Sequence, residues 1–173
     1  MELRVATAAD IPAVRTIYAH HVLHGLASFE VEPPSTEEMR RRFESVTGGG
    51  HPYLVAADGP EVLGFAYAGV YRARPGYRYT VEDSVYVAAD RQGRGIGRRL
   101  LTRLVDECER RGYRQMLAII GDSANAASIE LHRACGFVHA GTLRSVGLKF
   151  GRWIDSVLMQ RPLGESDCSV PAD

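Results

Sequence analysis

The chain has 173 residues, which is room for one domain with at most a short extension. Hydrophobic residues make up 45% and charged residues 24%, as in soluble proteins that bury a core. Twenty-one basic residues balance twenty-one acidic ones, and a net charge of zero argues against a nucleic-acid-binding protein or a polybasic membrane-surface protein. All basic residues except Lys149 are Arg. Codon usage or a need for guanidinium groups that bind phosphates and carboxylates would each explain this bias.

Three cysteines, Cys108, Cys135 and Cys168, are an odd number without CxxC spacing, which argues against a disulfide framework or a zinc site. The first residues show no signal-peptide pattern, and no window reaches the roughly 20 apolar residues of a membrane span. We therefore expect a protein of the cytoplasm with no metal site. Residues 164–173 are small and polar and predict a flexible tail after a single domain of residues 1–163.

Apolar patterning predicts an opening strand at residues 3–7 and two helices after it. The first helix follows Asp10, a good N-cap, and has Pro12 in its first turn. The second begins at Ser35 or Thr36, where the sequence STEE offers a capping box, and ends at the glycines 48–50.

Shorter patterns follow in the middle of the chain. They predict a hairpin at 53–57 and 62–71, a strand at 80–87, a glycine loop at 93–97 that opens a helix, and a strand at 116–120 that is apolar enough to be buried on both faces. A helix at about 125–135 and strands at 137–148 and 153–159 complete the chain. The order β-α-α-β-β-β-α-β-α-β-β predicts an α+β (mixed α/β) fold with a central mixed sheet of about seven strands and one parallel crossover.

The glycine loop at 93–97 carries the clearest chemical signal. Gly93, Gly95 and Gly97 let the backbone turn tightly between strand and helix, and the free N–H groups of the helix start favour an anion. No Gly-Lys-Ser/Thr follows, which excludes a P-loop, and the next strand ends in Ile119-Ile120-Gly121 without the acidic residue of a dinucleotide site.

Gln92, Gly95 and Gly97 in the pattern Gln-x-x-Gly-x-Gly resemble the acetyl-CoA pyrophosphate loop of GNAT-family N-acetyltransferases. Residues 125–137, which end in Gly136-Phe137, resemble the second cofactor segment of that family. The resemblance covers about residues 3–161 in the element order of the family. It implies a GNAT-like sheet and acetyl-CoA as co-substrate.

Residues 72–74, 80–87 and 147–155 are similar to the phosphinothricin acetyltransferase branch, which includes acyltransferases for methionine sulfone and methionine sulfoximine. This similarity implies acetyl transfer to the α-amino group of a small amino acid or analogue. It also implies a homodimer with shared sites, to which the segment around Lys149 contributes.

For acetyl-CoA, the resemblance implies a cradle of backbone N–H groups for the pyrophosphate, a strand edge for the pantetheine arm, and a second wall from the helix start. The residues implied are Val85, Tyr86, Val87, Gln92, Gly93, Arg94, Gly95, Gly97, Arg98, Asn125 and Ser128. Asn125 and Ser128 are also good N-cap residues, so a purely structural role is the alternative for both.

Two residues are candidates for catalysis. Glu82 matches the proposed catalytic carboxylate of the branch and would take a proton from the amine, directly or through water. His132 would relay that proton or hydrogen-bond the sulfur. The alternatives are a surface Glu and a structural His, and the Val87 N–H is the expected oxyanion donor.

The resemblance places Phe29, Arg72, Arg74 and Tyr77 at the acceptor site. Arg72 and Arg74 lie two apart, so in an extended segment they point the same way and would grip a carboxylate. Two other functions stay open: an acyl-CoA-binding sensor without turnover, and an enzyme for polyamines, aminoglycosides or protein N-termini.

Overall fold

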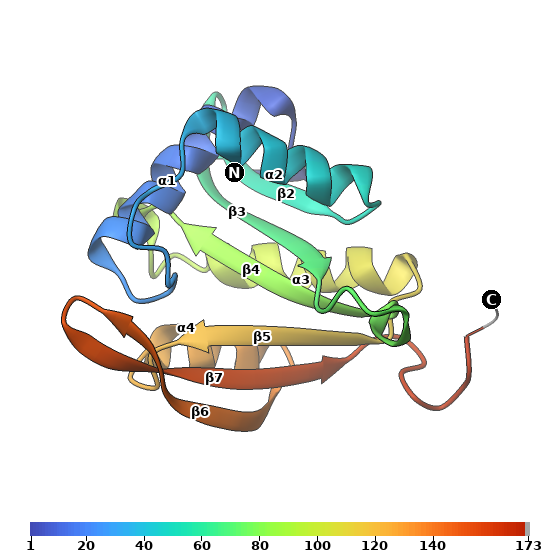
Figure 1. Cartoon of the computed structure of the whole chain (residues 1–173). Helices are drawn as coiled ribbons and strands as arrows, with labels where there is room; N and C mark the ends of the chain where they lie inside the picture. Colours follow the sequence, from blue (N-terminus) through green and yellow to red (C-terminus); the bar gives the residue numbers. More distant parts are fainter. Residues whose placement is uncertain (172–173) are drawn as a thin grey trace.

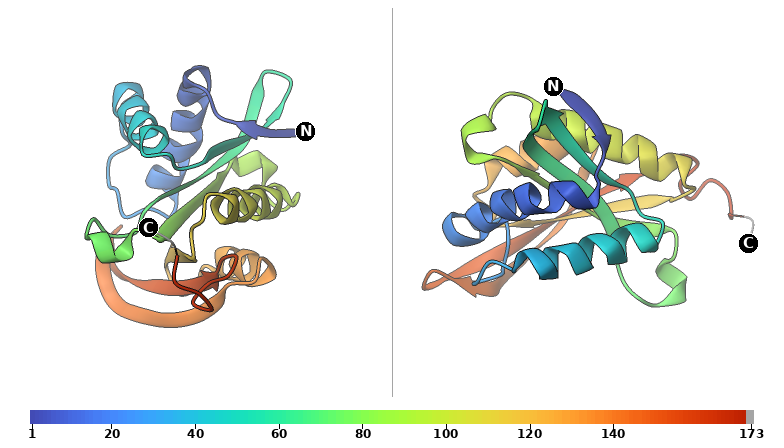
Figure 2. Two further views of the ribbon diagram at one scale, coloured as in Figure 1. Left: turned by 90° about the vertical axis from the view of Figure 1, so that its right-hand side faces the viewer. Right: turned by 90° about the horizontal axis from the view of Figure 1, so that it is seen from above.

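The computed structural model describes residues 1–171 as a seven-stranded sheet with helices on both faces (Figures 1 and 2). The predicted element order is confirmed. The elements are β1 (Glu2–Val5), α1 (Ile11–His24), α2 (Thr36–Gly48), β2 (Tyr53–Asp58), β3 (Glu61–Val70), β4 (Thr80–Val87), α3 (Ile96–Arg110), β5 (Gln115–Gly121), α4 (Ala126–Ala134), β6 (Val138–Lys149) and β7 (Arg152–Pro162). Across the sheet the strand order is β1-β2-β3-β4-β5-β7-β6.

Each face of the sheet carries its own apolar core. Helices α1 and α2 lie side by side over one face, where Ile11, Val14 and Phe43 pack on Phe65 (Figure 2). On the other face Leu100 and the rest of the apolar stripe of α3 pack on β2 to β5. The predicted core positions of Cys108 and Cys135 are confirmed, since both side chains are buried.

The start of α2 forms only one of the two hydrogen bonds of the predicted capping box. Ser35 Oγ accepts the N–H of Glu38 at 3.1 Å, as expected for an N-cap. The Glu38 carboxylate instead accepts hydrogen bonds from Arg41 and Arg42. Two guanidinium groups within one helical turn outcompete the backbone N–H of Ser35 for this carboxylate.

The prediction that strand 116–120 is buried on both faces is wrong for β5. Met116 and Ala118 are buried, but 40% of Ile119 is exposed. The physical reason is the geometry of the parallel pair β4–β5. Their pairing stops at Glu82 opposite Leu117, and beyond that point the two strands diverge (Figure 1). The gap leaves one face of β5 open and one edge of β4 without a partner strand.

The predicted tail begins after Leu163, which is fully buried. Within the described part, Glu165 pairs with Arg114 at 3.2 Å and Ser166 accepts a hydrogen bond from Gln115. The flexibility of this segment stays a prediction, and its last two residues, 172 and 173, lie outside the described residues. No helix in residues 1–171 combines the length and apolar character that a membrane crossing requires.

Candidate active site

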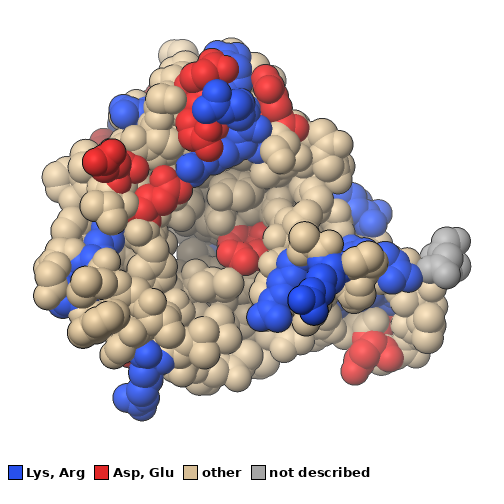
Figure 3. All heavy atoms as spheres, in the orientation of Figure 1, with Lys and Arg blue, Asp and Glu red and all other residues tan. Residues whose placement is uncertain are grey.

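The gap between β4 and β5 opens into a pocket of about 260 Å³, called here the acceptor pocket after the role that the resemblance predicts for it. Its lining comes from β4, β5, the start of α4 and the loop after α1: Ala27, Phe29, Tyr67, Glu82, Asp83, Ser84, Val85, Tyr86, Ala118, Ile119, Ile120, Gly121, Asn125, Ser128 and His132. In Figure 3 the molecule is hollowed near the centre of this face, and an acidic side chain shows in the wall of the hollow.

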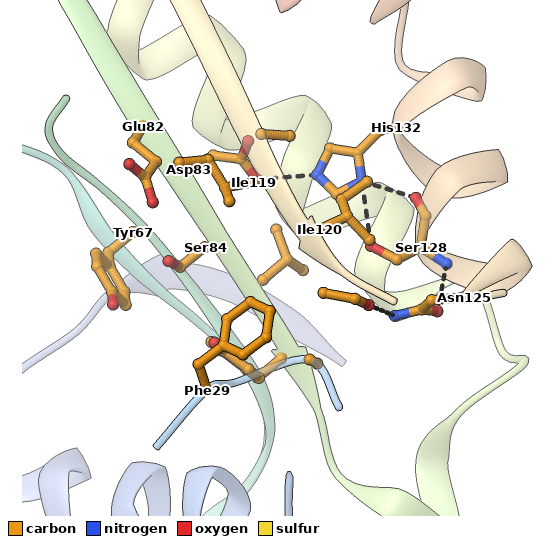
Figure 4. Close-up of a pocket in the computed structure, with 15 residues that line it drawn as sticks. Phe29, Tyr67, Glu82, Asp83, Ser84, Ile119, Ile120, Asn125, Ser128 and His132 are labelled. Atoms are coloured by element: carbon orange, nitrogen blue, oxygen red, sulfur yellow. Dashed lines mark hydrogen bonds and ion pairs between the residues drawn. The ribbon is translucent and has the colours of Figure 1, made fainter. Parts of the chain in front are cut away.

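Glu82 and Asp83 leave β4 on opposite sides, because side chains alternate along a strand (Figure 4). Glu82 lies with Ser84 and Tyr67 on the side covered by α1 and α2, and it is half-buried. Burial, reinforced by the nearby charge of Asp83, raises the pKa of Glu82 above its usual value. A carboxylate with a raised pKa is a stronger base for an amine proton.

Asp83 lies on the other side and pairs with His132, whose Nε2 is 3.0 Å from Asp83 Oδ2 (Figure 4). The side chains are 1% and 6% exposed. The second ring nitrogen, Nδ1, is 2.7 Å from the carbonyl oxygen of Ser128. Both ring nitrogens of His132 are therefore engaged, which leaves neither for direct contact with a sulfur atom.

The start of α4 forms the opposite wall. Asn125 is the N-cap, and its Oδ1 accepts the N–H of Ser128 at 3.2 Å. Both side chains nevertheless line the acceptor pocket and a second, larger hollow. The structural role is thus present for Asn125, and it is compatible with the predicted contact to a cofactor.

The second hollow is a groove of about 640 Å³, called here the cofactor groove, that runs from the acceptor pocket to the start of α3. All predicted cofactor residues except Arg94 line it: Val85, Tyr86, Val87, Gln92, Gly93, Gly95, Gly97, Arg98, Asn125 and Ser128. Gly93 and Gly95 have positive φ angles of 73° and 76°, which favour glycine. The N–H groups of the first turn of α3 have no intrahelical partners, so the groove ends at a helix start that favours an anion.

The arginines between Arg91 and Arg114 differ in their partners. Arg91 pairs with Glu61 at 2.7 Å, and Glu107 pairs with Arg103, Arg110 and Arg111. Arg114 pairs with Glu165. Within the described residues, Arg94, Arg98 and Arg99 are the arginines of this segment without an ion pair, and of these Arg98 lines the groove. Positive charge for a polyphosphate thus concentrates at the start of α3.

The free edge of β4 supplies the groove with backbone groups. Beyond Glu82 this strand pairs only with β3, so Val85 and Val87 have no strand on their other side. His21 of α1 forms a hydrogen bond with one of these backbone groups, since its Nε2 is 2.8 Å from the Val87 carbonyl oxygen. Burial lowers the pKa of His21, which favours the neutral ring that donates this hydrogen bond.

The loop of residues 25–29 separates the two hollows, and Ala27 lines both of them. Lys149 holds this loop, because its ammonium group donates to the carbonyl oxygens of Ser28 at 2.6 Å and Gly25 at 3.0 Å. The lysine is 3% exposed. Lys149 therefore acts on the site from within its own chain, by fixing a wall rather than by lining a pocket.

Two glycines let the 25–29 loop approach the sheet. A Cβ on Gly121 would lie 2.1 Å from the Leu26 carbonyl oxygen, and a Cβ on Gly147 would lie 2.1 Å from the Phe29 ring. The Phe29 ring thus packs directly on Gly147 and lines the acceptor pocket, and its contact with an acceptor stays a prediction.

The other three predicted acceptor residues lie elsewhere. Arg72, Arg74 and Tyr77 belong to the loop between β3 and β4, and none of them lines the acceptor pocket. The Arg72 guanidinium stacks on Tyr77, 5.5 Å from the ring centre. Within one chain, the structure brings together Glu82, His132 and Phe29 but not the two arginines.

Sequence reasoning missed Asp83, Tyr67 and His21. Asp83 had a signal, because a carboxylate occupies a strand position whose neighbours two residues away are Val81 and Val85. A charge on the apolar side of a buried strand needs a partner. Tyr67 and His21 carry no comparable signal, since their roles depend on how α1 crosses the sheet.

Comparison with known proteins shows the family of the chain. The model of the acetyltransferase (GNAT) family matches residues 19–137. The chain is 56% identical to phosphinothricin N-acetyltransferase of Alcaligenes faecalis over 98% of this chain and 86% of the relative. It is 44% identical to an L-methionine sulfoximine/L-methionine sulfone acetyltransferase of Salmonella typhimurium, over 95% and 96%.

A solved structure is similar as well. The phosphinothricin acetyltransferase of Sinorhizobium meliloti in complex with AcCoA superposes with a TM-score of 0.97 at 47% identity, covering 99% of this chain and 93% of that one. The protein therefore belongs to the GNAT acetyltransferase family. It is an acetyl-CoA-dependent N-acetyltransferase, related to enzymes that act on phosphinothricin and methionine sulfoximine.

Proposed function

We propose that the protein transfers the acetyl group of acetyl-CoA to the α-amino group of a small amino acid or analogue, of the phosphinothricin, methionine sulfone or methionine sulfoximine type. The reaction is a direct attack of the amine on the thioester while both substrates are bound. The observation that carries the proposal is the shared wall of the two hollows. The cofactor groove and the acceptor pocket meet at Ala27, Val85, Tyr86, Asn125 and Ser128, so a thioester and an amine come together there.

Glu82 is the general base in this proposal. It lines the acceptor pocket, and its raised pKa suits it to accept a proton from the ammonium form of the acceptor, through one water where direct contact is too long. The N–H of Val87, on the free edge of β4, is the oxyanion donor. The small volume of the pocket supports an acceptor of amino-acid size.

The acceptor is tested by thiol release from acetyl-CoA with phosphinothricin, methionine sulfone, methionine sulfoximine, the common L-amino acids, spermidine and an aminoglycoside. We expect turnover with amino-acid analogues and little with polyamines. Faster turnover with spermidine would contradict the proposed acceptor class. Tight binding of acetyl-CoA without turnover of any amine would favour the acyl-CoA sensor instead.

The Glu82→Gln variant tests the base. We expect kcat at pH 7 to fall about 100-fold, a typical contribution of general base catalysis, with the KM for acetyl-CoA nearly unchanged. In the unchanged enzyme, kcat should fall as the pH decreases through the raised pKa of Glu82. A Gln variant with the same rate across pH 6–9 would remove Glu82 as the base.

We also propose that the protein is a homodimer. The hairpin of β6 and β7 supports an interface, because Val146, Leu148 and Trp153 are each more than half exposed and Leu148 pairs opposite Trp153. Light scattering should show a dimer that Trp153→Glu dissociates and that Val170→Glu, a matched change in the exposed tail, leaves intact. A monomeric unchanged enzyme would contradict this proposal.

A further inference from the structure

The hydrogen bonds of the buried pair of Asp83 and His132 constrain where its protons lie. A backbone carbonyl only accepts hydrogen bonds, so His132 Nδ1, 2.7 Å from the Ser128 oxygen, carries a hydrogen. Where Asp83 carries its negative charge, its oxygens only accept, so Nε2, 3.0 Å from Asp83 Oδ2, carries a hydrogen as well. A ring with two N–H groups is an imidazolium, and Asp83 is its counter-ion.

The surroundings support this charge state. Burial by itself lowers the pKa of His132, but the hydrogen bond and charge of Asp83 outweigh burial and raise it above its usual value. The other titratable groups close to Asp83 are Glu82 on β4 and Cys108 on α3. Burial raises the pKa of Cys108 to about 12, so this thiol stays neutral and does not compete for the proton.

Ser128 connects the pair to the place of reaction. Its hydroxyl oxygen is 3.4 Å from His132 Nδ1, next to the carbonyl oxygen that shares the same hydrogen. Ser128 also lies on the wall common to the cofactor groove and the acceptor pocket. The side chain of Tyr86 is the other hydroxyl on this wall, but it faces Tyr18 of α1.

We propose that Ser128, His132 and Asp83 form a relay that protonates the departing sulfur of the acetyl donor. The inference rests on the proposed function and adds the general acid that protonates the leaving group. As the amine nitrogen bonds to the thioester carbon, the C–S bond breaks and its electron pair goes to sulfur. Sulfur takes the hydroxyl proton of Ser128, and Ser128 takes the Nδ1 proton of His132.

The protons balance over one turnover. The ammonium form of the acceptor loses two protons on its way to the amide. Glu82 takes one before the attack and, after releasing it to solvent, takes the second from the same nitrogen as the C–N bond forms. His132 Nδ1 regains one proton from solvent through the open acceptor pocket. The net change is one proton moved from the acceptor nitrogen to the thiol and one released to solvent. Asp83 is a positioning residue, because its side chain is only 1% exposed and it acts by holding the ring charged. The second carboxylate oxygen of Asp83, Oδ1, is buried and has no hydrogen-bond partner. The principal polar contact of the Asp83 side chain is therefore the one between Oδ2 and the His132 ring.

Kinetics of three variants test the relay. Ser128→Ala should lower kcat about 100-fold, the scale of general acid catalysis, with the KM for acetyl-CoA within about twofold, and Ser128→Thr should recover most of the rate. Asp83→Asn should shift both limbs of the kcat–pH profile to lower pH, because it removes the charge that raises the pKa of both His132 and Glu82. Asp167→Asn, a change in the exposed tail, is the matched control.

The charge state has a readout that does not need turnover. In ¹⁵N-labelled enzyme, both ring nitrogens of His132 should be protonated at pH 7 and should lose that state in Asp83→Asn, with folding confirmed by the remaining spectrum. A singly protonated ring in the unchanged enzyme would overturn the inference. So would an active Ser128→Ala enzyme beside an inactive Tyr86→Phe enzyme. Absence of turnover with every amine would instead refute the proposed function. The ¹⁵N signals of the His132 ring would still show whether the ring is doubly protonated beside Asp83.

Discussion

Lys149 is the one lysine of the chain, and its replacement by Met should weaken both the fold and the site. Methionine has a similar length and volume but donates no hydrogen bond. The carbonyl oxygens of Gly25 and Ser28 would then lose the ammonium donor that lies 3.0 Å and 2.6 Å from them. Since these oxygens belong to the 25–29 loop, the loss of both hydrogen bonds would destabilise the wall between the two hollows.

The magnitude follows from the contacts. Each carbonyl left without a donor costs about 1–3 kcal/mol, so two of them cost about 2–6 kcal/mol. Methionine recovers part of this cost, because a buried ammonium without a carboxylate partner is itself unfavourable, as the lowered pKa of Lys149 indicates. We expect the free energy of unfolding to fall by about 2–4 kcal/mol.

Urea denaturation measures this change, and hydrogen exchange of the amides at 25–29 locates it. The KM values for acetyl-CoA and for the acceptor should both rise, because Ala27 lines both hollows. Arg144→Met, an exposed cation on the same strand, is the control. If Lys149→Met matched this control in stability and in exchange at 25–29, the loop would not depend on the lysine and the reasoning would be wrong.

Two further predictions concern single contacts. Gly147→Ala should displace the Phe29 ring, whose nearest carbon would lie 2.1 Å from the new Cβ, and should raise the acceptor KM more than the acetyl-CoA KM; equal increases in steady-state kinetics would contradict this. Asp10 accepts two hydrogen bonds from Arg4 at 2.7 and 2.8 Å, and mainly for this reason its pKa is lowered to about 2. A lowered pKa stabilises the fold above about pH 4, and this contribution, about 1–2 kcal/mol, is lost between about pH 4 and 2. Asp10→Asn should therefore lower stability at pH 7 and leave it less sensitive to acid in urea denaturation; an unchanged acid dependence would refute the assignment.

Local patterns in the sequence were enough to predict the order of the elements. Periodicity of apolar residues, glycines at turns and N-cap residues act within a few positions of the chain, and they located the strands and helices to within a few residues. The residues of the cofactor groove were expected from the family resemblance, which itself rests on short motifs. The glycine loop, the free strand edge before it and the start of α4 are each short segments with their own signature.

The acceptor side depended on contacts between distant segments. The opening of β4 away from β5 is not encoded in either strand alone, and it exposes Ile119, which the apolar run 116–120 had predicted to be buried. The 25–29 loop reaches the site through Lys149, more than a hundred residues later in the chain. Arg72 and Arg74 show the same limit, since a matching motif did not bring them to the pocket of their own chain.

The scarcity of lysine gives this protein an internal reporter. Reagents that acylate primary amines find one lysine side chain, and that side chain is 3% exposed beneath the 25–29 loop. Modification of Lys149 therefore requires the loop to open, so the labelling rate at this one position measures the opening of the wall between donor and acceptor. Because this one lysine is buried, the enzyme presents no exposed lysine side chain that the thioester of acetyl-CoA could acetylate.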